Sequence, residues 1–227
     1  MKADPTLPML TPPHHHRRRL VLAALSWGLL GVAGCARSPP MRLYQLRSEP
    51  PEDFPPSAAD AALAADTGVW ELSPMVALPG SLDRDTLFLA RDDAGLEPLE
   101  GHRWAEPLRD AVPRLLLHDL QALRGPARVW QAPAPAGVVP VRRLRVDLLV
   151  LQASADRRTL RLQARWWWTP LAAPGALPPA RPRAPWPGGA SFNVPVANAS
   201  VDALAAAHRL ALWRLARELV LTAAAES

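Results

Sequence analysis

The chain contains a single cysteine, Cys35, among its 227 residues. One cysteine cannot form an internal disulfide, so a disulfide framework is excluded and folding must depend on a hydrophobic core. A zinc site built from several thiolates is excluded for the same reason. The histidines that follow Cys35, at positions 102, 118 and 208, have no metal-ligand spacing among themselves. We therefore expect no metal.

Lysine is almost absent, since Lys2 is the only one and every other basic residue is arginine. The formal net charge is +5, but residues 1–34 carry +3 of it and leave +2 for the remaining 193 residues. So weak an excess of positive charge removes the main support for a nucleic-acid partner.

No apolar run reaches the length of roughly 17–25 residues that a membrane-spanning helix needs. The uncharged run at residues 20–34 has fifteen residues and follows three arginines, Arg17 to Arg19. It ends in two small residues, Ala33 and Gly34, directly before Cys35. A basic segment, a short apolar segment and small residues at the cleavage point are typical of an export signal.

The residues Val32 to Cys35 resemble the lipobox of bacterial lipoproteins, in which cleavage precedes a cysteine that carries diacylglycerol. The resemblance implies cleavage between Gly34 and Cys35, with Cys35 as the lipidated first residue. The alternative is an ordinary export signal, which leaves an unpaired cysteine unexplained in an exported protein. Each buried methylene contributes about 0.8 kcal/mol, so two or three chains on one cysteine hold a protein on a membrane permanently.

Alternation of apolar and polar residues predicts several short strands. They lie at residues 41–46, 68–79, 86–91, 96–103, 129–130, 142–152, 159–168 and 191–196. The stretches 142–152 and 159–168 alternate most clearly and predict an antiparallel hairpin with one buried face.

Two helices are predicted from leucine spacing. The first begins near Pro107, with Glu106 at its cap, and stops at Gly125; Pro113 predicts a kink or a later start. Ser200 caps the second helix, whose apolar face contains His208 as a packed, hydrogen-bonded residue. The opposite side of that helix carries Arg209, Trp213 and Arg217.

These elements predict an α+β fold: one mostly antiparallel sheet with two amphipathic helices packed on one face, in a single domain. We expect a signal peptide at 1–34 and a lipidated N-terminus with a first short strand and a Pro/Ala-rich tether at 35–67. The globular domain then covers 68–227, with a proline-rich insertion at 170–189.

No arrangement of residues in the sequence predicts catalysis. No nucleophile elbow, P-loop or dinucleotide-binding fingerprint occurs. The pairs Asp92-Asp93 and Asp83/Asp85 lie beside turns, where solvated aspartates are expected. We therefore expect no enzyme.

The consecutive tryptophans 166–168 are the most unusual local feature. A strand places two of them toward the core and one on the other side. Trp167 and Trp213 are candidates for an exposed aromatic surface that meets lipid or a partner. Packing alone, with Trp213 stacked on arginine, is the alternative interpretation.

The six residues from Arg103 to Leu108 read Arg-Trp-Ala-Glu-Pro-Leu and precede a leucine-rich helix. This segment resembles one found in the PqiC-like ABC-type transport auxiliary lipoproteins. The lipobox, a Tyr44-Gln45-Leu46 strand and the segment Leu82-Asp83-Arg84 lie in the order expected for that family. Three departures concern local geometry: Ser73-Pro74 in place of Gly-Pro, Pro113 within the first helix, and the long segment 170–189.

The resemblance implies an auxiliary subunit of a lipid transport system that supports envelope integrity. Its partners would be an MCE-domain conduit protein and an inner-membrane permease, and a homo-oligomer is left open. Ala36 is not the aspartate that retains lipoproteins at the inner membrane, so the periplasmic face of the outer membrane is expected. Leu82, Asp83, Arg84, Arg103, Trp104, Glu106 and Pro107 form either a docking patch or a purely structural corner.

Two other functions remain open at the level of sequence. A lipoprotein that carries or presents one phospholipid needs an apolar cavity between sheet and helices. An envelope hydrolase is disfavoured because a nucleophile and its base are missing. The covalent lipid on Cys35 is the only non-protein group that we expect.

Overall fold

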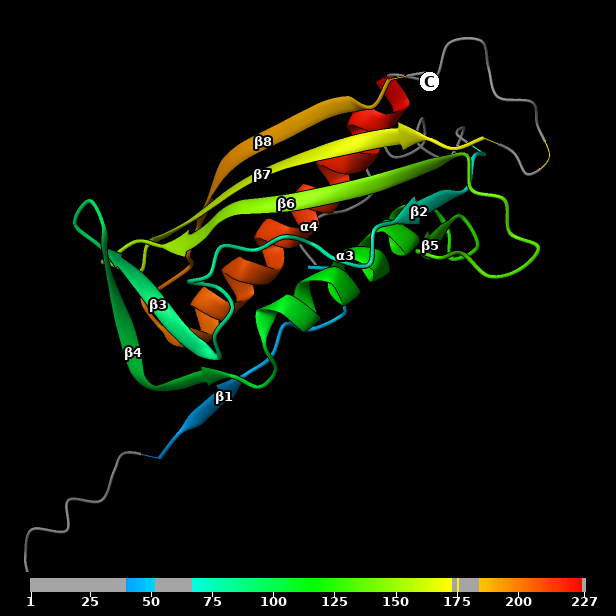
Figure 1. Cartoon of the computed structure of the whole chain (residues 1–227). Coiled ribbons are helices and arrows are strands. Elements are labelled where there is room, and N and C mark those ends of the chain that lie inside the picture. Colours follow the sequence, from blue (N-terminus) through cyan, green and yellow to red (C-terminus); the bar gives the residue numbers. More distant parts are fainter. Residues whose placement is uncertain (1–39, 52–66, 173–174, 176–183, 226–227) are drawn as a thin grey trace, which may run out of the picture. The chain divides into compact units, whose positions relative to one another are not determined.

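The computed structural model describes residues 40–51, 67–172, 175 and 184–225 (Figure 1). From Met41 onward the chain forms one compact unit with helices and a mixed sheet, which confirms the prediction of a single α+β domain. The predicted signal peptide, Gly34 and Cys35 lie outside the described residues, as does the part of the predicted tether at 52–66.

Three long strands form an antiparallel group: β6 (Arg142–Ala153), β7 (Thr159–Pro170) and β8 (Trp186–Pro195). β7 pairs with both neighbours along its length. Alternate side chains of β7 enter the core, as the two-residue period of a strand requires. The prediction of a hairpin is confirmed, and Trp166 and Trp168 are buried.

The ends of the predicted insertion at 170–189 belong to strands, because β7 continues to Pro170 and β8 begins at Trp186. Gly188 of β8 lies opposite Trp166 of β7. A Cβ atom on Gly188 would lie 2.2 Å from Trp166 Nε1. The fully buried indole thus fills the space that any larger residue at position 188 needs.

The other edge of β6 carries two strands, one at each end. β2 (Trp70–Leu72) pairs parallel with its first residues, and β3 (Thr86–Arg91) pairs parallel with its last. β4 (Gly95–Trp104) is antiparallel to β3, whereas β1 (Arg42–Tyr44) is parallel to β4 and β5 (Val129–Gln131) is parallel to β2. The prediction of a mostly antiparallel sheet is wrong, and the sheet is mixed. Parallel pairs join distant segments through long crossovers, so no local turn signals them.

Two helices cover the inner side of this sheet (Figure 1). α3 (Leu108–Arg124) packs beside α4 (Val201–Ala225), and α4 packs against β7 and β8. α3 begins one residue after Pro107 and runs through Pro113. The Ser200 hydroxyl accepts a hydrogen bond from the Ala203 amide at 3.1 Å, which confirms the predicted cap of α4.

α4 is buried around most of its circumference, as is typical of a helix at the centre of a core. Arg209 and Trp213, which the sequence places opposite its apolar face, are each only 6% exposed. The side of α4 that the sequence places opposite its apolar face is therefore covered at Arg209 and Trp213. The reason is that the residues after β1 lie against its second side, where Arg209 bonds the carbonyl groups of Ser48 and Glu49.

Candidate functional site

Two predicted motifs meet at one corner of the fold. The Arg103 guanidinium donates to the Asp85 carboxylate at 2.8 Å, and the Trp104 amide donates to the Asp85 carbonyl oxygen at 2.6 Å. In addition, the Arg109 guanidinium at the start of α3 lies 3.1 Å from the Asp83 carboxylate. Residues 82–86 and 103–109 are called the corner below, and they bring the Leu-Asp-Arg segment beside the Arg-Trp-Ala-Glu-Pro segment.

The outer side of the corner is a polar hollow, lined by Asp83, Arg84, Asp85, Thr86, Arg103, Pro107 and Arg109. Its ion pairs are exposed, and exposed pairs contribute little to stability, about 0–1 kcal/mol each. Arg84 is exposed at the rim of this hollow. The hollow therefore presents a cluster of charged side chains to solvent.

The inner side of the corner is fastened by Trp104. Its ring is buried and makes an edge-to-face contact with the His208 ring of α4, with 5.1 Å between centroids. Leu82 is partly buried against the same core. Trp104 thus links β4 to α4 through an aromatic pair, in the edge-to-face geometry that such rings prefer.

Glu106 and Pro107 form the entry to α3. The helix cap is Pro107 rather than the predicted Glu106, and its backbone has the extended conformation that precedes a helix. The Glu106 carboxylate forms an ion pair with Arg114, one residue past Pro113. Glu106 therefore ties the entry loop to the second turn of α3 instead of capping the helix.

The corner lies directly beside β1. Leu43 is in register with Arg103 and Tyr44 with Trp104, and the Ala105 amide donates to the Tyr44 carbonyl oxygen at 2.7 Å. Met41 and Leu43 are 56% and 65% exposed, while Tyr44 and Leu46 enter the core. Residues 41–46 therefore belong to the folded unit and end next to the corner.

A buried ion pair, which the sequence analysis missed, holds the segment after β1. The Arg209 guanidinium binds both carboxylate oxygens of Asp119, at 2.9 and 2.7 Å, and donates to the carbonyl groups of Ser48 and Glu49. Burial raises the pKa of Asp119 to about 6, against the opposing effect of Arg209. An acidic residue on the leucine-rich face of α3 is the sequence signal that could have identified it.

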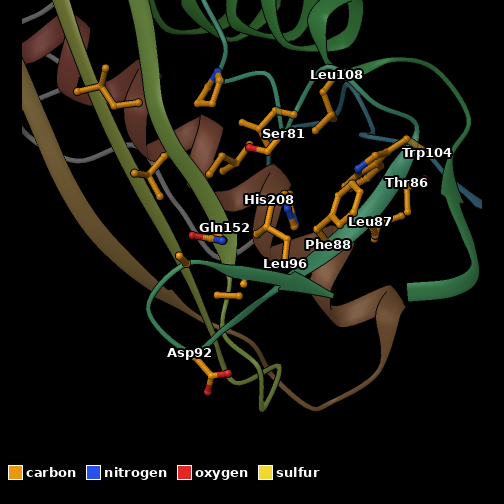
Figure 2. A pocket seen from close by; sticks show the side chains of 18 of the residues that line it. Ser81, Thr86, Leu87, Phe88, Asp92, Leu96, Trp104, Leu108, Gln152 and His208 are labelled. Carbon is orange, nitrogen blue, oxygen red and sulfur yellow. The ribbon is translucent and has the colours of Figure 1, made fainter. Parts of the chain in front are cut away.

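A pocket of about 300 Å³ lies behind the corner, between the β3–β4 hairpin, the end of β6 and α4 (Figure 2). Its lining is mixed, with Leu87, Phe88 and Leu108 beside Ser81, Asp92 and Gln152. Leu96 and Leu149 also line it and are exposed at the surface. His208 is 6% exposed and lines the pocket. Burial lowers the pKa of His208 to about 4, so its ring is neutral at pH 7.

Trp167 and Trp213 differ in their environments. Trp167 lies on the outer face of β7, where the guanidinium groups of Arg165 and Arg145 lie over its ring at 5.1 and 5.8 Å. Trp213 is buried and lies under Arg209 at 5.7 Å. The prediction of an exposed ring is therefore wrong for Trp213, because its ring is only 6% exposed.

The described part of the chain offers no group of three or more His, Cys, Asp or Glu side chains that could hold a metal ion. Among the described residues, no helix combines the length and the apolar character that crossing a membrane requires. Cys35, the candidate site of lipidation, stays a prediction because it lies outside these residues.

Comparisons with known proteins agree with the arrangement of these elements. The family described as "ABC-type transport auxiliary lipoprotein component" matches residues 44–220. A crystal structure of an uncharacterized protein superposes with a TM-score of 0.56 at 15% identity, covering 80% of this chain and 97% of the other. A Xanthomonas campestris protein of the family DUF330 superposes with a TM-score of 0.53 at 16% identity, covering 79% and 92%. No curated protein matches the chain.

Proposed function

The chain belongs to the family of ABC-type transport auxiliary lipoprotein components, and from this premise we propose that it is a lipid-anchored, non-catalytic docking subunit. Cys35 carries the lipid and holds the domain on the periplasmic face of the outer membrane. The corner docks an MCE-domain conduit protein that works with an inner-membrane permease, and the resulting contact supports envelope integrity.

The position of β1 carries this proposal. Only five residues lie between Cys35 and Met41, which limits the distance between their Cα atoms to about 20 Å even when the chain is fully extended. β1 pairs with residues His102 to Trp104 of β4, so the corner begins where the short tether ends. A lipidated Cys35 therefore keeps the corner close to the membrane surface.

Attachment of the next residues keeps the tether short. The Arg209–Asp119 pair holds Ser48 and Glu49, and Leu46 is buried in the core. Residues 41–49 therefore belong to the folded unit and add no length to the segment between Cys35 and the domain. Such restraint suits a subunit that must present one surface to a conduit reaching the same membrane.

The second candidate function is a lipoprotein that itself carries or presents a phospholipid. The pocket beside His208 is the observation that favours it, because leucine and aromatic side chains form part of its wall and it lies between sheet and helix. At about 300 Å³ it holds roughly ten water-sized atoms. Two acyl chains with a headgroup are several times larger, so docking is better supported than carriage of a whole phospholipid.

Capture from membranes tests the proposed function. The full chain is tagged at its C-terminus, and solubilised membranes are analysed for bound proteins with wild type, Cys35→Ser and Arg84→Glu. Arg158→Glu is the matched control, since Arg158 is an exposed arginine on the β6–β7 turn. We expect MCE-domain and permease partners with wild type and with Arg158→Glu, and several-fold lower capture with Arg84→Glu.

Each outcome concerns a different part of the proposal. Equal membrane retention of wild type and Cys35→Ser refutes the anchor. Equal capture by Arg84→Glu and wild type refutes docking through the corner. Absence of MCE-domain and permease proteins from the wild-type sample refutes the proposed partners.

A further inference from the structure

The exposed side of β1 carries two apolar residues directly after the short tether to Cys35. We infer that this side rests on the bilayer that holds the lipid of Cys35, with Met41 and Leu43 in its interfacial layer. Arg42 and Arg47 then contact the lipid phosphates. The inference rests on the proposed lipid anchor and deepens it, because a second contact beside the anchor fixes which side of the domain is turned toward the membrane.

The first argument is the alternation of exposure along residues 41–47. Tyr44 and Leu46 enter the core, whereas Met41 and Leu43 are 56% and 65% exposed. A strand places every second side chain on the same face, so Met41 and Leu43 share the outer face of β1. Methionine and leucine are usually buried in folded proteins. Two of them together on one exposed face indicate a contact surface rather than a chance exposure.

The second argument is charge. Residues 36–48 contain three arginines, at positions 37, 42 and 47, and no acidic residue. Arg42 and Arg47 are exposed. An arginine beside an apolar surface lays its stem along that surface and places its guanidinium at the polar boundary. Anionic lipids attract such residues at a membrane surface, so charge complementarity favours a lipid surface as the occupant.

The third argument is reach. The chain between Cys35 and Met41 spans at most about 20 Å, so a lipid inserted in the bilayer keeps the start of β1 near the headgroups. A short tether gives the second contact an effective concentration in the millimolar range. Two apolar side chains and two arginines therefore suffice to hold β1 on the surface, although the same few residues bind a free protein only weakly.

The fourth argument separates a bilayer from a protein partner. On the exposed side of residues 41–47, apolar Met41 and Leu43 come first, polar Gln45 follows, and basic Arg47 comes last. The apolar residues of this side are thus the nearest to the anchor along the chain. A bilayer has the same order, because its apolar layer holds the anchor and its phosphates lie outside that layer.

The contact also agrees with the position of the corner. Leu43 is in register with Arg103, so the corner begins at the edge of the membrane-facing side of β1. A conduit that reaches the same membrane therefore meets the corner at the level of the bilayer surface.

Fluorescence of the full lipidated chain in vesicles tests the inference. Cys35 is the only cysteine and has no free thiol when lipidated, so Leu43→Cys introduces a single site for a nitrobenzoxadiazole maleimide dye. The labelled protein is reconstituted into vesicles of phosphatidylethanolamine and phosphatidylglycerol in equal amounts, with or without a spin-labelled lipid. The readout is quenching of the dye by the spin-labelled lipid, which requires contact with the bilayer.

Val141→Cys is the matched control. Val141 is apolar and 45% exposed, and its amide donates to the Val69 carbonyl oxygen beside β2, at the other end of the domain from β1 (Figure 1). We expect several-fold stronger quenching of the dye at position 43 than at position 141. Adding Arg47→Glu to Leu43→Cys should lower the quenching, because it reverses a charge at the phosphates, whereas adding Arg158→Glu should leave it unchanged.

Equal quenching at positions 43 and 141 overturns the inference. A dye at position 43 whose emission is blue-shifted but not quenched shows that a protein surface, such as a second copy, covers β1, and this overturns it too. Unchanged quenching with Arg47→Glu overturns the phosphate contact. If Leu43→Cys fails to fold, Met41→Cys gives the same reading, since Met41 shares the exposed face. Uptake of dye by wild type reveals a free Cys35 thiol and refutes the anchor itself, so failure of the anchor and failure of this contact are told apart.

Discussion

The Arg209–Asp119 pair links the two helices to the segment that leads to the anchor, and Arg209→Met tests its role. The substitution removes four hydrogen bonds from a guanidinium that is itself buried. It leaves the Asp119 carboxylate in the core without its cation. The pKa of Asp119, already raised to about 6 by burial, then rises further because Arg209 no longer lowers it.

The expected cost of Arg209→Met is about 3–5 kcal/mol in the free energy of unfolding, as for other buried pairs that lose one partner. With a urea m-value of about 2 kcal/mol/M, the unfolding midpoint falls by about 1.5–2.5 M. The double variant Asp119→Leu with Arg209→Met leaves no isolated charge, and we expect it to lie within about 1 kcal/mol of wild type.

Both variants lose the bonds to Ser48 and Glu49, so the segment 45–51 should loosen in each. Urea unfolding at pH 7 measures the stabilities, and amide hydrogen exchange measures the segment, where we expect about tenfold faster exchange. A single variant as stable as the double one would show that the isolated charge is unimportant. Unchanged exchange in a folded double variant would show that Arg209 does not hold the segment.

Other predictions concern pH and packing. His208 has a pKa of about 4 in the folded protein and 6.5 in the unfolded chain, so the unfolded chain binds the proton first as pH falls. The free energy of unfolding therefore decreases by up to about 3 kcal/mol as pH falls from 6.5 to 4. Asp119 has the opposite effect: its pKa of about 6 lies above the ordinary aspartate value of 3.8, so stability rises by a similar amount as pH falls from 6 to 3.8. Relative to wild type, His208→Phe should therefore gain stability on acidification, and the Asp119→Leu/Arg209→Met double variant should lose it. Urea titrations at pH 7 and pH 4.5 measure both changes. Parallel pH profiles of stability for all three proteins would contradict the assignment. Gly188→Ala should cost about 1–3 kcal/mol because its Cβ meets the Trp166 indole, whereas Gly80→Ala, with no atom within 4 Å, should change the melting temperature little; equal effects of the two would contradict the packing argument.

The local elements of this fold follow closely from sequence patterns. The alternation in 142–152 and 159–168 identifies β6 and β7, and the leucine spacing after Pro107 identifies α3. The parallel pairs of β1 with β4 and of β2 with β5 could not be predicted, because they depend on packing between segments far apart in the chain. The mixed character of the sheet follows from these distant pairs.

The corner was predicted as a set of residues but not as a geometry. The Arg103 to Pro107 segment and the Leu82 to Arg84 segment were singled out by resemblance, and only the structure shows that Asp85 joins them. His208 was correctly interpreted as a packed, hydrogen-bonded residue, yet the pocket that it lines depends on three-dimensional packing. Arg209 lies opposite the apolar face of α4, as predicted, but helical periodicity cannot reveal that another segment covers this second face.

The central claim is that a lipid on Cys35 fixes a docking domain at a membrane. Mass spectrometry of the N-terminal peptide, from protein isolated out of the membrane fraction of cells that express the full chain, tests this claim most directly. The account predicts a peptide that begins at Cys35 and carries the mass of a diacylglyceryl group. A chain recovered in the soluble fraction with an unmodified Cys35 thiol would contradict it.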